Sequence, residues 1–514
     1  MSDVMTAASR YRQLESSRSS VLDRARDAAK LTIPSLMPPS GHSESSKLPT
    51  PFQGIGARGV NNLASKLLLA LFPPNSPFFR LAVDDFTLVK MTQREGMRAE
   101  VEKALNQIER SVMTEIESSA IRVSAFEALK QLIVAGNVLL YLPPEGGMRV
   151  FKLNQFVVKR DPMGNVLEIV VQEKVSPDAL PENVQSHIKN TSKTNEKTVE
   201  LYTHVVRSKS AWRVRQEVKG MTIPGSKGSY PLDKSPWIVL RFTKIDGEDY
   251  GRGYVEEYYG DLMSLEALTQ AIVEGSAAAA KVLFLVDPNG TTNPRTLAEA
   301  PSGAIRSGNA NDVTVLQMQK YGDFRMAQET IQSIQQRLSF AFLMNTAIQR
   351  AGERVTAEEI RYMAGELEDA LGGTYSILSQ EFQLPLVMRL MFQMERQGRL
   401  PVLPKGIVRP TITTGLEALG RGHDMNKLRL FGQIAAEAAA LPPEINKDDY
   451  LKRAGTSLGI DMAGLIKSPE QLQAEQQMAQ MQMLIDKLGP KGMDILRDQM
   501  NPQVNGNGPQ APAE

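Results

Sequence analysis

The spacing of apolar residues changes twice along the chain, and this change constrains the fold more than any single motif. Between about residues 148 and 245, apolar residues recur with a period of two, which is typical of β-strands. On both sides of this stretch they recur at the three- and four-residue spacing of amphipathic helices. Strands and helices segregated in this way indicate an α+β fold, here predominantly helical.

Helical spacing predicts four helices ahead of the strand-rich stretch. A glycine-rich sequence, residues 54–59, opens the second of them. Ser124 and Glu127 have the spacing of a capping box that begins the fourth, and Gly136 ends it. The predicted helices cover residues 10–33, 60–72, 94–119 and 124–135, and a short buried strand follows at 138–142.

The stretch with period two predicts an antiparallel sheet. Residues 161–165 (DPMGN) form a turn signal between two apolar strands, so we expect a hairpin there. Polar or glycine- and proline-rich sequences at 184–197 and 223–235 are expected to be connectors. The predicted strands are 156–160, 166–171, 199–206, 212–218 and 237–242.

After residue 250 the pattern becomes helical. One continuous helix is expected over 255–283 and a second over 324–344. Between them, residues 287–320 are rich in glycine, proline and asparagine and include a β-like piece at 313–318. This order predicts an antiparallel pair of helices that carries a protruding tip.

A charged loop and a strongly specified helix start follow at residues 345–361. Thr356 and Glu359 form a capping box for a long helix that begins at Ala357. Arg350 and Arg354 lie in the loop before this cap. They are suited equally to ion pairs with neighbouring glutamates and to contacts with phosphate groups, and the residues alone leave both interpretations open.

The remaining sequence is helical with interruptions. We expect a kink at residues 372–373, a continuation past Pro385 to about residue 397, and shorter helices over 405–465. A Gln- and Met-rich helix begins near Ser468, and the composition after residue 500 is typical of a disordered tail.

Composition narrows the class of protein. The chain has 514 residues, 42% of them apolar, and no cysteine, so disulfides and thiol chemistry are excluded. No leader-like segment begins it and no apolar run reaches membrane-spanning length, so we expect a soluble protein without a membrane partner. Lys and Arg (59) balance Asp and Glu (58). This balance argues against tight, extended DNA binding but not against a surface past which DNA slides.

The search for catalytic or binding chemistry is negative. The sequence contains no phosphate-binding P-loop motif and no serine nucleophile elbow. The glycines at 54, 56 and 59 follow no strand of a βαβ unit, so backbone packing explains them better than phosphate binding. The four histidines (His42, His187, His204 and His423) lack metal-ligand spacing. We therefore expect no enzyme activity, no catalytic residue, no cofactor and no metal.

Four long stretches carry a resemblance to a known family. They are residues 56–73 (GARGVNNLASKLLLALFP), 126–143 (FEALKQLIVAGNVLLYLP), 352–381 (GERVTAEEIRYMAGELEDALGGTYSILSQE) and 415–422 (GLEALGRG). With them, the chain resembles the portal proteins, or head-to-tail connectors, of short-tailed, podovirus-type bacteriophages. The similarity covers roughly residues 10 to 465 in the same order.

The resemblance implies an elongated subunit with wing, stem, clip and crown parts, which assembles into a ring, usually of twelve copies, around an axial channel. It implies the following parts: an α+β wing at 1–253, a first stem helix at 254–286, a clip at 287–322, a second stem helix at 323–345, a tunnel loop at 346–356, a long wing-crossing helix at 357–403, a helical crown at 404–500 and a disordered tail at 501–514.

The resemblance also implies a function and partners. Such a ring serves packaging and ejection of double-stranded DNA without sequence specificity, with Arg350 and Arg354 as a positive collar in the channel. The small residues Ala277, Ala278, Ala279 and Ala280 are candidates for subunit packing. Implied partners are other copies of the chain, a terminase packaging motor, tail adaptor and tail tube proteins, capsid and scaffolding proteins, and internal core proteins. The implied location is the head–tail junction of the virion, after assembly in the host cytoplasm.

Two other classes of protein are weighed against this one. A helical adaptor or scaffold without a channel is compatible with the Gln-rich C-terminal segment. A nucleic-acid-processing enzyme would need an acidic metal cluster or a phosphate loop, which the sequence does not supply.

Overall fold

The computed structural model describes residues 5–43, 45–73, 77–83, 97–191, 197–279, 283–316, 321–344, 365–367, 369–371, 373–403, 408–412, 429–438, 442 and 446–458. The chain forms two compact units, Met1–Ala418 and Leu419–Glu514. In the described part of the first unit, helices and antiparallel sheets occur together, which confirms the α+β class. The second unit contributes a helix at 429–438 and α15 (Lys447–Ser457).

The largest sheet has the strand order β4-β5-β6-β7-β8, with β9 also paired to β7. The expected hairpin between β4 and β5 is confirmed. Its turn is held because the Asp161 carboxylate accepts a hydrogen bond from the Asn165 N–H (2.7 Å), and Gly164 takes a positive φ of 86°. The strands are β4 (Phe156–Arg160), β5 (Val166–Val175), β6 (Val199–Arg207), β7 (Ala211–Val218), β8 (Met221–Thr222) and β9 (Gly228–Pro231).

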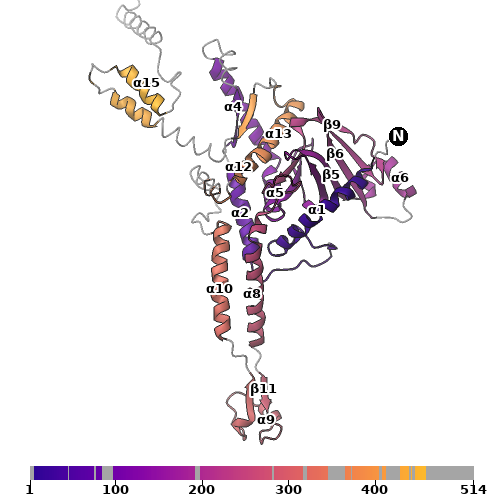
Figure 1. Cartoon of the computed structure of the whole chain (residues 1–514), viewed down its shortest axis with the longest axis vertical. Helices are drawn as coiled ribbons and strands as arrows, with labels where there is room; N and C mark the ends of the chain where they lie inside the picture. The colour runs from indigo at the N-terminus through magenta and orange to yellow at the C-terminus, as the bar shows by residue number, and fades with distance from the viewer. Residues whose placement is uncertain are drawn as a thin grey trace, which may run out of the picture. The chain divides into compact units, whose positions relative to one another are not determined.

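Helix α1 (Ala7–Lys30) covers one face of this sheet (Figure 1). The Thr6 hydroxyl caps the helix by accepting from the Ser9 N–H. Tyr11 packs edge-on against Tyr202 of β6. Alternate residues of the same strands face the main core on the other side of the sheet, so the sheet is buried on both faces where α1 lies.

The main core is built by helices α2 (Ile55–Leu71), α4 (Met97–Ser118) and α5 (Ile121–Ala135) together with a smaller sheet of order β10-β2-β3. The small sheet contains β2 (Asn137–Tyr141), β3 (Arg149–Phe151) and β10 (Trp237–Arg241). Gly136 ends α5 at a φ of 71° and lies so close to Arg252 that a Cβ atom would be 2.4 Å from the Arg252 backbone. Only glycine fits this junction.

Two predicted helix starts are wrong. Helix α2 begins at Ile55, so the glycines at 56 and 59 lie within the helix and not before it. Helix α5 begins at Ile121, after Ala120 in a left-handed conformation, so Ser124 and Glu127 are inside the helix and do not cap it. The burial of Ile121 against the core determines this start, and packing outweighs the local capping signal.

The polar connector predicted at 184–197 is also wrong in part. Residues Glu182–Thr191 form α6, whose Val184 and Ile188 pack with Leu180, Val199 and Val218 in a small separate core. These two residues are one turn apart on the helix. They bury one apolar stripe of an otherwise polar helix.

The chain then forms the predicted helix pair, with different ends. Helices α7 (Tyr254–Glu257) and α8 (Tyr259–Ala279) replace the single helix expected at 255–283, and α10 (Tyr321–Ala341) is the second member of the pair. Leu283–Val286, expected as helix, is strand β11 and pairs with β12 (Val313–Leu316), so the β-like piece at 313–318 is confirmed in its first part. A short helix, α9 (Pro294–Ala298), lies between the two strands in sequence.

The helix predicted over 357–403 is interrupted within its described residues. Gly373 is the N-cap of α12 (Thr374–Leu378), and a π-helical turn (Ser379–Gln383) joins α12 to α13 (Leu384–Arg396). This turn lies ahead of Pro385, which has no N–H to donate and whose ring would clash with the carbonyl of Glu381 in a regular helix. The structure ends the helix at Arg396.

A strand occurs where only helices were expected. Residues Val408–Ile412 form β13, which pairs antiparallel with β1 (Phe79–Val83) from the N-terminal part of the chain. The helical assignment of 404–500 is therefore wrong at these residues. The Gln- and Met-rich helix and the tail at 501–514 lie outside the described residues.

Candidate functional site

Helices α8 and α10 lie side by side and run antiparallel (Figure 1). At one end, Arg337 of α10 donates to Asp261 of α8 at 2.8 Å. Toward the other end, Gly275 of α8 faces Phe324 of α10, and a Cβ atom at Gly275 would be 2.8 Å from that ring. The glycine lets the two helices approach closely where the pair leads to the tip.

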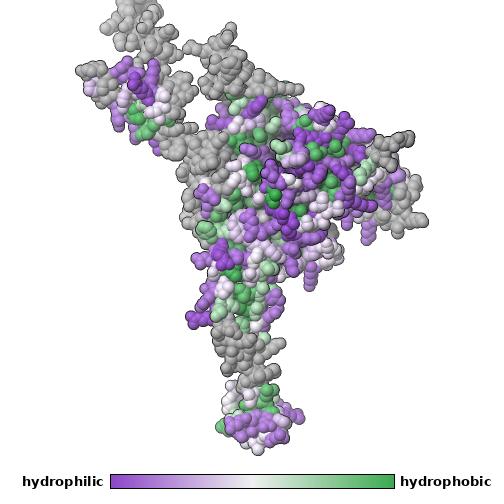
Figure 2. All heavy atoms as spheres, viewed as in Figure 1, coloured by the Kyte–Doolittle hydropathy of each residue, from purple (hydrophilic) through white to green (hydrophobic). Residues whose placement is uncertain are grey.

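The surface of this helix pair keeps large apolar side chains exposed. Leu262 and Leu265 of α8 are fully buried, yet Met263 and Val273 of the same helix are about half exposed (51% and 50%). On α10, Phe340 is 76% exposed. Figure 2 shows green and white spheres among the purple ones along this pair. The exposed side of α8 also carries Gln270 and Glu274, so it is of mixed polarity, and its apolar side chains are open to contact with another chain.

The predicted small-residue cluster lies at the end of α8. Ala277 and Ala278 are exposed, whereas Ala280 lies outside the described residues, as does the side chain of Ala279. The close contact within the chain is made one turn earlier by Gly275. Sequence reasoning missed this residue, although an isolated glycine inside a helical pattern is a signal for a close approach.

At the tip, several hydrogen bonds converge on one carboxylate, that of Asp312, and we call this network the polar knot. Asp312 accepts hydrogen bonds from the backbone N–H groups of Thr291 (2.8 Å) and Thr292 (3.1 Å) and from the Thr292 hydroxyl (3.0 Å). Partial burial opposes ionisation, but these hydrogen bonds prevail and lower the pKa of Asp312. The knot fixes residues 287–312, and the large apolar side chains of Phe284, Leu285 and Ile305 remain exposed around it.

One face of α2 holds the chain on both sides of the segment that contains the predicted arginines. Asn62 donates its side-chain N–H to the carbonyl oxygens of Phe342 (2.9 Å) and Leu343 (3.1 Å). One turn further along α2, the Lys66 ammonium donates to the Glu366 carboxylate at 2.9 Å. Residues just before 345 and just after 364 are thereby attached to neighbouring positions of one rigid helix.

Gly59 belongs to the same face of α2. A Cβ atom there would be 2.6 Å from the Phe342 ring, so only glycine permits this contact. Phe342 also packs edge-on against Tyr254, whose hydroxyl donates to the Ala341 carbonyl at 2.9 Å. Burial, together with the neighbouring Tyr258 hydroxyl, raises the pKa of Tyr254, which therefore remains a neutral donor. The glycine serves packing and not phosphate binding.

The predicted loop and cap residues fall between these anchors. Arg350, Arg354, Thr356 and Glu359 all lie outside the described residues. The anchors themselves were not predicted. Their signal was present as two polar residues, Asn62 and Lys66, one turn apart in an apolar helix.

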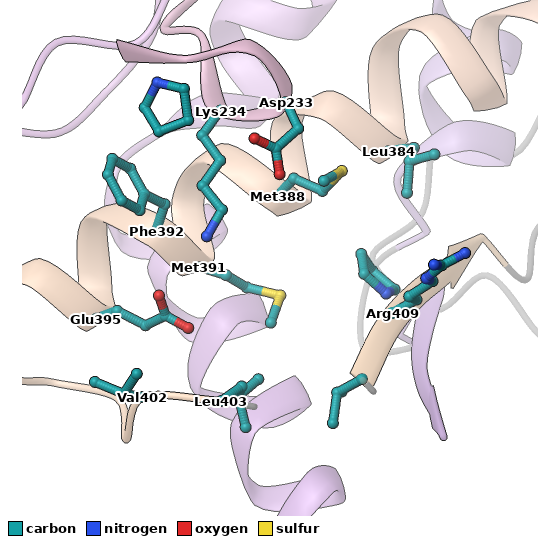
Figure 3. A pocket seen from close by; sticks show the side chains of 13 residues that line it. Asp233, Lys234, Leu384, Met388, Met391, Phe392, Glu395, Val402, Leu403 and Arg409 are labelled. Carbon is teal, nitrogen blue, oxygen red and sulfur yellow. The ribbon is translucent and has the colours of Figure 1, made fainter. Parts of the chain in front are cut away.

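A concavity lies beside α13 and has a volume of about 690 Å³ (Figure 3). Met388, Met391 and Phe392 from α13 face Val402 and Leu403, and Lys234, Glu395 and Arg409 lie at its walls. None of its lining residues is a serine, a cysteine or a histidine. Its lining is thus mixed, with apolar side chains beside four charged ones, Asp233, Lys234, Glu395 and Arg409. In the described ranges no group of three or more potential metal ligands occurs, and no helix there is long and apolar enough to cross a membrane.

The family model described as "Bacteriophage head to tail connecting protein" matches residues 4–466. The portal protein of Escherichia phage T7 is 45% identical over 493 residues, 93% of this chain and 91% of that protein. The portal protein of Enterobacteria phage T3 is 46% identical over 480 residues, 91% of this chain and 89% of that protein. The portal protein of Enterobacteria phage SP6 is 30% identical over 489 residues, 93% of each chain.

A solved structure described as the neck of an empty GTA particle aligns over 80% of this chain and 90% of its own, but at 13% identity and a TM-score of 0.36 it supports no argument. The sequence relatives and the family model are enough to assign the family. The chain belongs to the family of bacteriophage head to tail connecting proteins, and its role is that of a portal protein.

Proposed function

We propose that copies of this chain form a ring, of twelve subunits, around an axial channel for double-stranded DNA at one vertex of the capsid. The observation that carries the proposal is the incompletely covered helix α8, with Met263 and Val273 half exposed in the single chain. A ring interface is heterologous, so each copy offers one surface to one neighbour and a different surface to the other. Covering the apolar side of α8 with the neighbouring copy would remove this surface from water.

The stem pair is suited to a channel wall along which DNA moves. Most exposed residues of α10 are polar, apart from Met326 and Phe340, and its charged side chains in the described part are paired: Arg325 with Glu329 at 3.2 Å and Arg337 with Asp261. Unpaired cations would bind phosphates and slow movement, whereas amides bind them weakly. Between the charges, α10 exposes four glutamines, Gln328, Gln332, Gln335 and Gln336.

Phosphate contact is assigned to the tunnel loop at 346–356. Repeated around the axis, Arg350 and Arg354 would form collars of positive charge that hold packaged DNA without reading its sequence. The Thr356–Glu359 capping box would fix the start of the helix behind the loop. The Asn62 and Lys66 anchors on α2 support this assignment, because they attach the chain before and after the loop to one rigid helix.

The remaining parts receive roles by the same proposal. Residues 1–253 form the wing toward the capsid, with 254–286 and 323–345 as the stem. Residues 287–322 form the clip, where the terminase motor docks first and tail adaptor and tail tube proteins later. Residues 357–403 cross the wing, and 404–500 form the crown toward internal core proteins, apart from strand β13. The four alanines at 277–280 would pack against the neighbouring stem, and capsid and scaffolding proteins would contact the wing.

Replacing Arg354 by alanine tests the collar. Each copy would lose charge-assisted hydrogen bonds to phosphate, which contribute roughly 1.5–3 kcal/mol each, so heads should retain less DNA while rings still form. The measurement is the DNA content of purified heads, alongside electron microscopy of the rings. Arg12→Ala, at an exposed arginine of α1, is the matched control and should leave DNA content unchanged. Normal genome-filled heads from Arg354→Ala would refute the role of the collar without refuting the ring.

A further inference from the structure

A second, basic cavity lies on the large sheet, away from the helix pair. It has a volume of about 520 Å³, and its lining residues come from β6, β7, β9 and the residue just before β9. Val206, which is 38% exposed, gives it an apolar floor. No residue of α1 lines it, although α1 covers the neighbouring part of the same sheet face.

The strand register concentrates positive charge in this cavity. His204 of β6 lies opposite Arg215 of β7, and Val206 lies opposite Arg213. Residues opposite each other in an antiparallel pair point to the same side of the sheet, as do residues two apart in one strand. Arg213 and Arg215 are therefore neighbours on the face that forms the cavity, and Lys227 adds a third cation at its edge. Without an anion, such a group of like charges is unfavourable.

Nearby carboxylates neutralise only part of the positive charge of the cavity. Glu217 lies 2.9 Å from Arg215 Nε, and it also accepts from the Ala7 N–H at the start of α1. Arg213 and Lys227 are exposed, and in the part of the chain that the structure describes neither forms an ion pair. Two cations of the cavity are thus free to meet an incoming anion.

A further carboxylate beside the lining residue His204, that of Glu168, is already paired. It accepts from Arg10 of α1 at 2.6 Å and lies 2.6 Å from His204 Nε2. Burial opposes its ionisation, but the hydrogen bonds from His204 and Arg10 lower the pKa of Glu168 to about 2. His204 is 8% exposed, and its second ring nitrogen, Nδ1, is buried with no hydrogen-bond partner among the described residues. His204 also lines the cavity, and a buried polar atom without a partner is uncommon in a folded protein.

We propose that this cavity binds an acidic, extended segment of a partner protein. Carboxylates of the segment pair with Arg213 and Lys227, and one of its apolar side chains rests on Val206. The size of the cavity suits two or three side chains. Two free cations are too few for a DNA track, which needs a longer basic surface. The site involves neither the helix pair nor the tunnel loop, so it does not depend on ring formation.

The test is binding of a short fluorescent peptide of alternating Asp, Glu and Val to the full chain, followed by anisotropy. Replacing both cations (R213E/K227E) should weaken binding by about tenfold or more, and R213A/K227A should weaken it less, in the same direction. The control K174E/R306E makes the same change of net charge at two exposed cations outside the cavity and should bind within about twofold of the unaltered chain.

Three outcomes would overturn the proposal. R213E/K227E could bind the peptide as tightly as the unaltered chain. Both charge-reversal variants could lose binding equally, which would show an effect of net charge and not of this site. Finally, R213E/K227E could lose affinity for a short DNA duplex but keep its affinity for the peptide, which would assign the cations to nucleic acid. Because all four substituted residues are exposed, the variants should melt at the temperature of the unaltered chain, and this is measured first.

Discussion

At the scale of single residues, the buried pair of Lys66 and Glu366 links α2 to a part of the chain 300 positions away. Their side chains are 7% and 18% exposed. Replacing Lys66 by methionine would leave the Glu366 carboxylate without its cation, because breaking a buried pair from one side costs more than removing the pair. We expect a loss of about 3 kcal/mol in the free energy of unfolding, measured by urea titration.

The double variant is the control for this prediction. With Lys66→Met and Glu366→Met together, no buried charge remains, so most of the lost stability should return. If Lys66→Met alone were as stable as the unaltered chain, the pair would not be an anchor.

Gly59 gives a second prediction at this scale. In an open helix, alanine is more stable than glycine by up to about 1 kcal/mol. At Gly59 the added Cβ would be 2.6 Å from Phe342, so we expect Gly59→Ala to destabilise the chain by about 1–3 kcal/mol. The matched control is Gly260→Ala in α8, where nothing lies within 4 Å and the change should be neutral or slightly stabilising. Equal melting temperatures for the two variants would contradict the close contact.

These residues show what sequence could and could not give at this scale. The residue types could be seen in the sequence: a lysine and an asparagine in an apolar helix, and a glycine one turn before them. Their partners were not, because Phe342 and Glu366 are about 300 positions away in the chain. Phosphate binding at the glycines could be disfavoured from sequence, but the residue that packs on Gly59 could be found only in three dimensions.

At the scale of elements, α1 is held on the large sheet by Arg10, Glu168 and His204. The pKa of Glu168 falls from its ordinary 4.5 to about 2 in the folded chain. A carboxyl group with a lowered pKa adds stability above its ordinary pKa, and this stability is lost as the pH falls from about 4.5 to 2. Allowing for solvent screening, we expect the loss to be roughly 2 kcal/mol.

The measurement compares urea unfolding at pH 6 and pH 3 for the unaltered chain and for Glu168→Gln. The variant cannot titrate at this position, so its stability should fall less over the same interval of pH. Parallel losses in the two proteins would show that Glu168 does not contribute.

Element boundaries were predicted well where a turn residue fixes them and poorly where packing does. The β4–β5 hairpin followed from DPMGN, and the end of α5 followed from Gly136. In contrast, α6 depends on packing of Val184 and Ile188 against distant strands. Strand β13 depends on a partner, β1, from the opposite end of the first unit. Local sequence carries no information about such partners.

At the scale of the whole molecule, sequence was informative in a different way. The resemblance to portal proteins was expected over residues 10 to 465, and the family model matches 4–466. Physical reasoning from composition gave only a soluble α+β chain with balanced charge. It could not show that Met263 and Val273 of α8 are half exposed, because apolar periodicity alone does not distinguish burial within a chain from burial between copies.

Electron microscopy of the purified full-length chain tests the central claim, that copies of it assemble into a ring through the stem. The predicted result is a closed ring with an axial hole, in which the face of α8 that carries Met263 and Val273 is covered by the neighbouring copy. Isolated monomers, or an oligomer without a central hole, would contradict it.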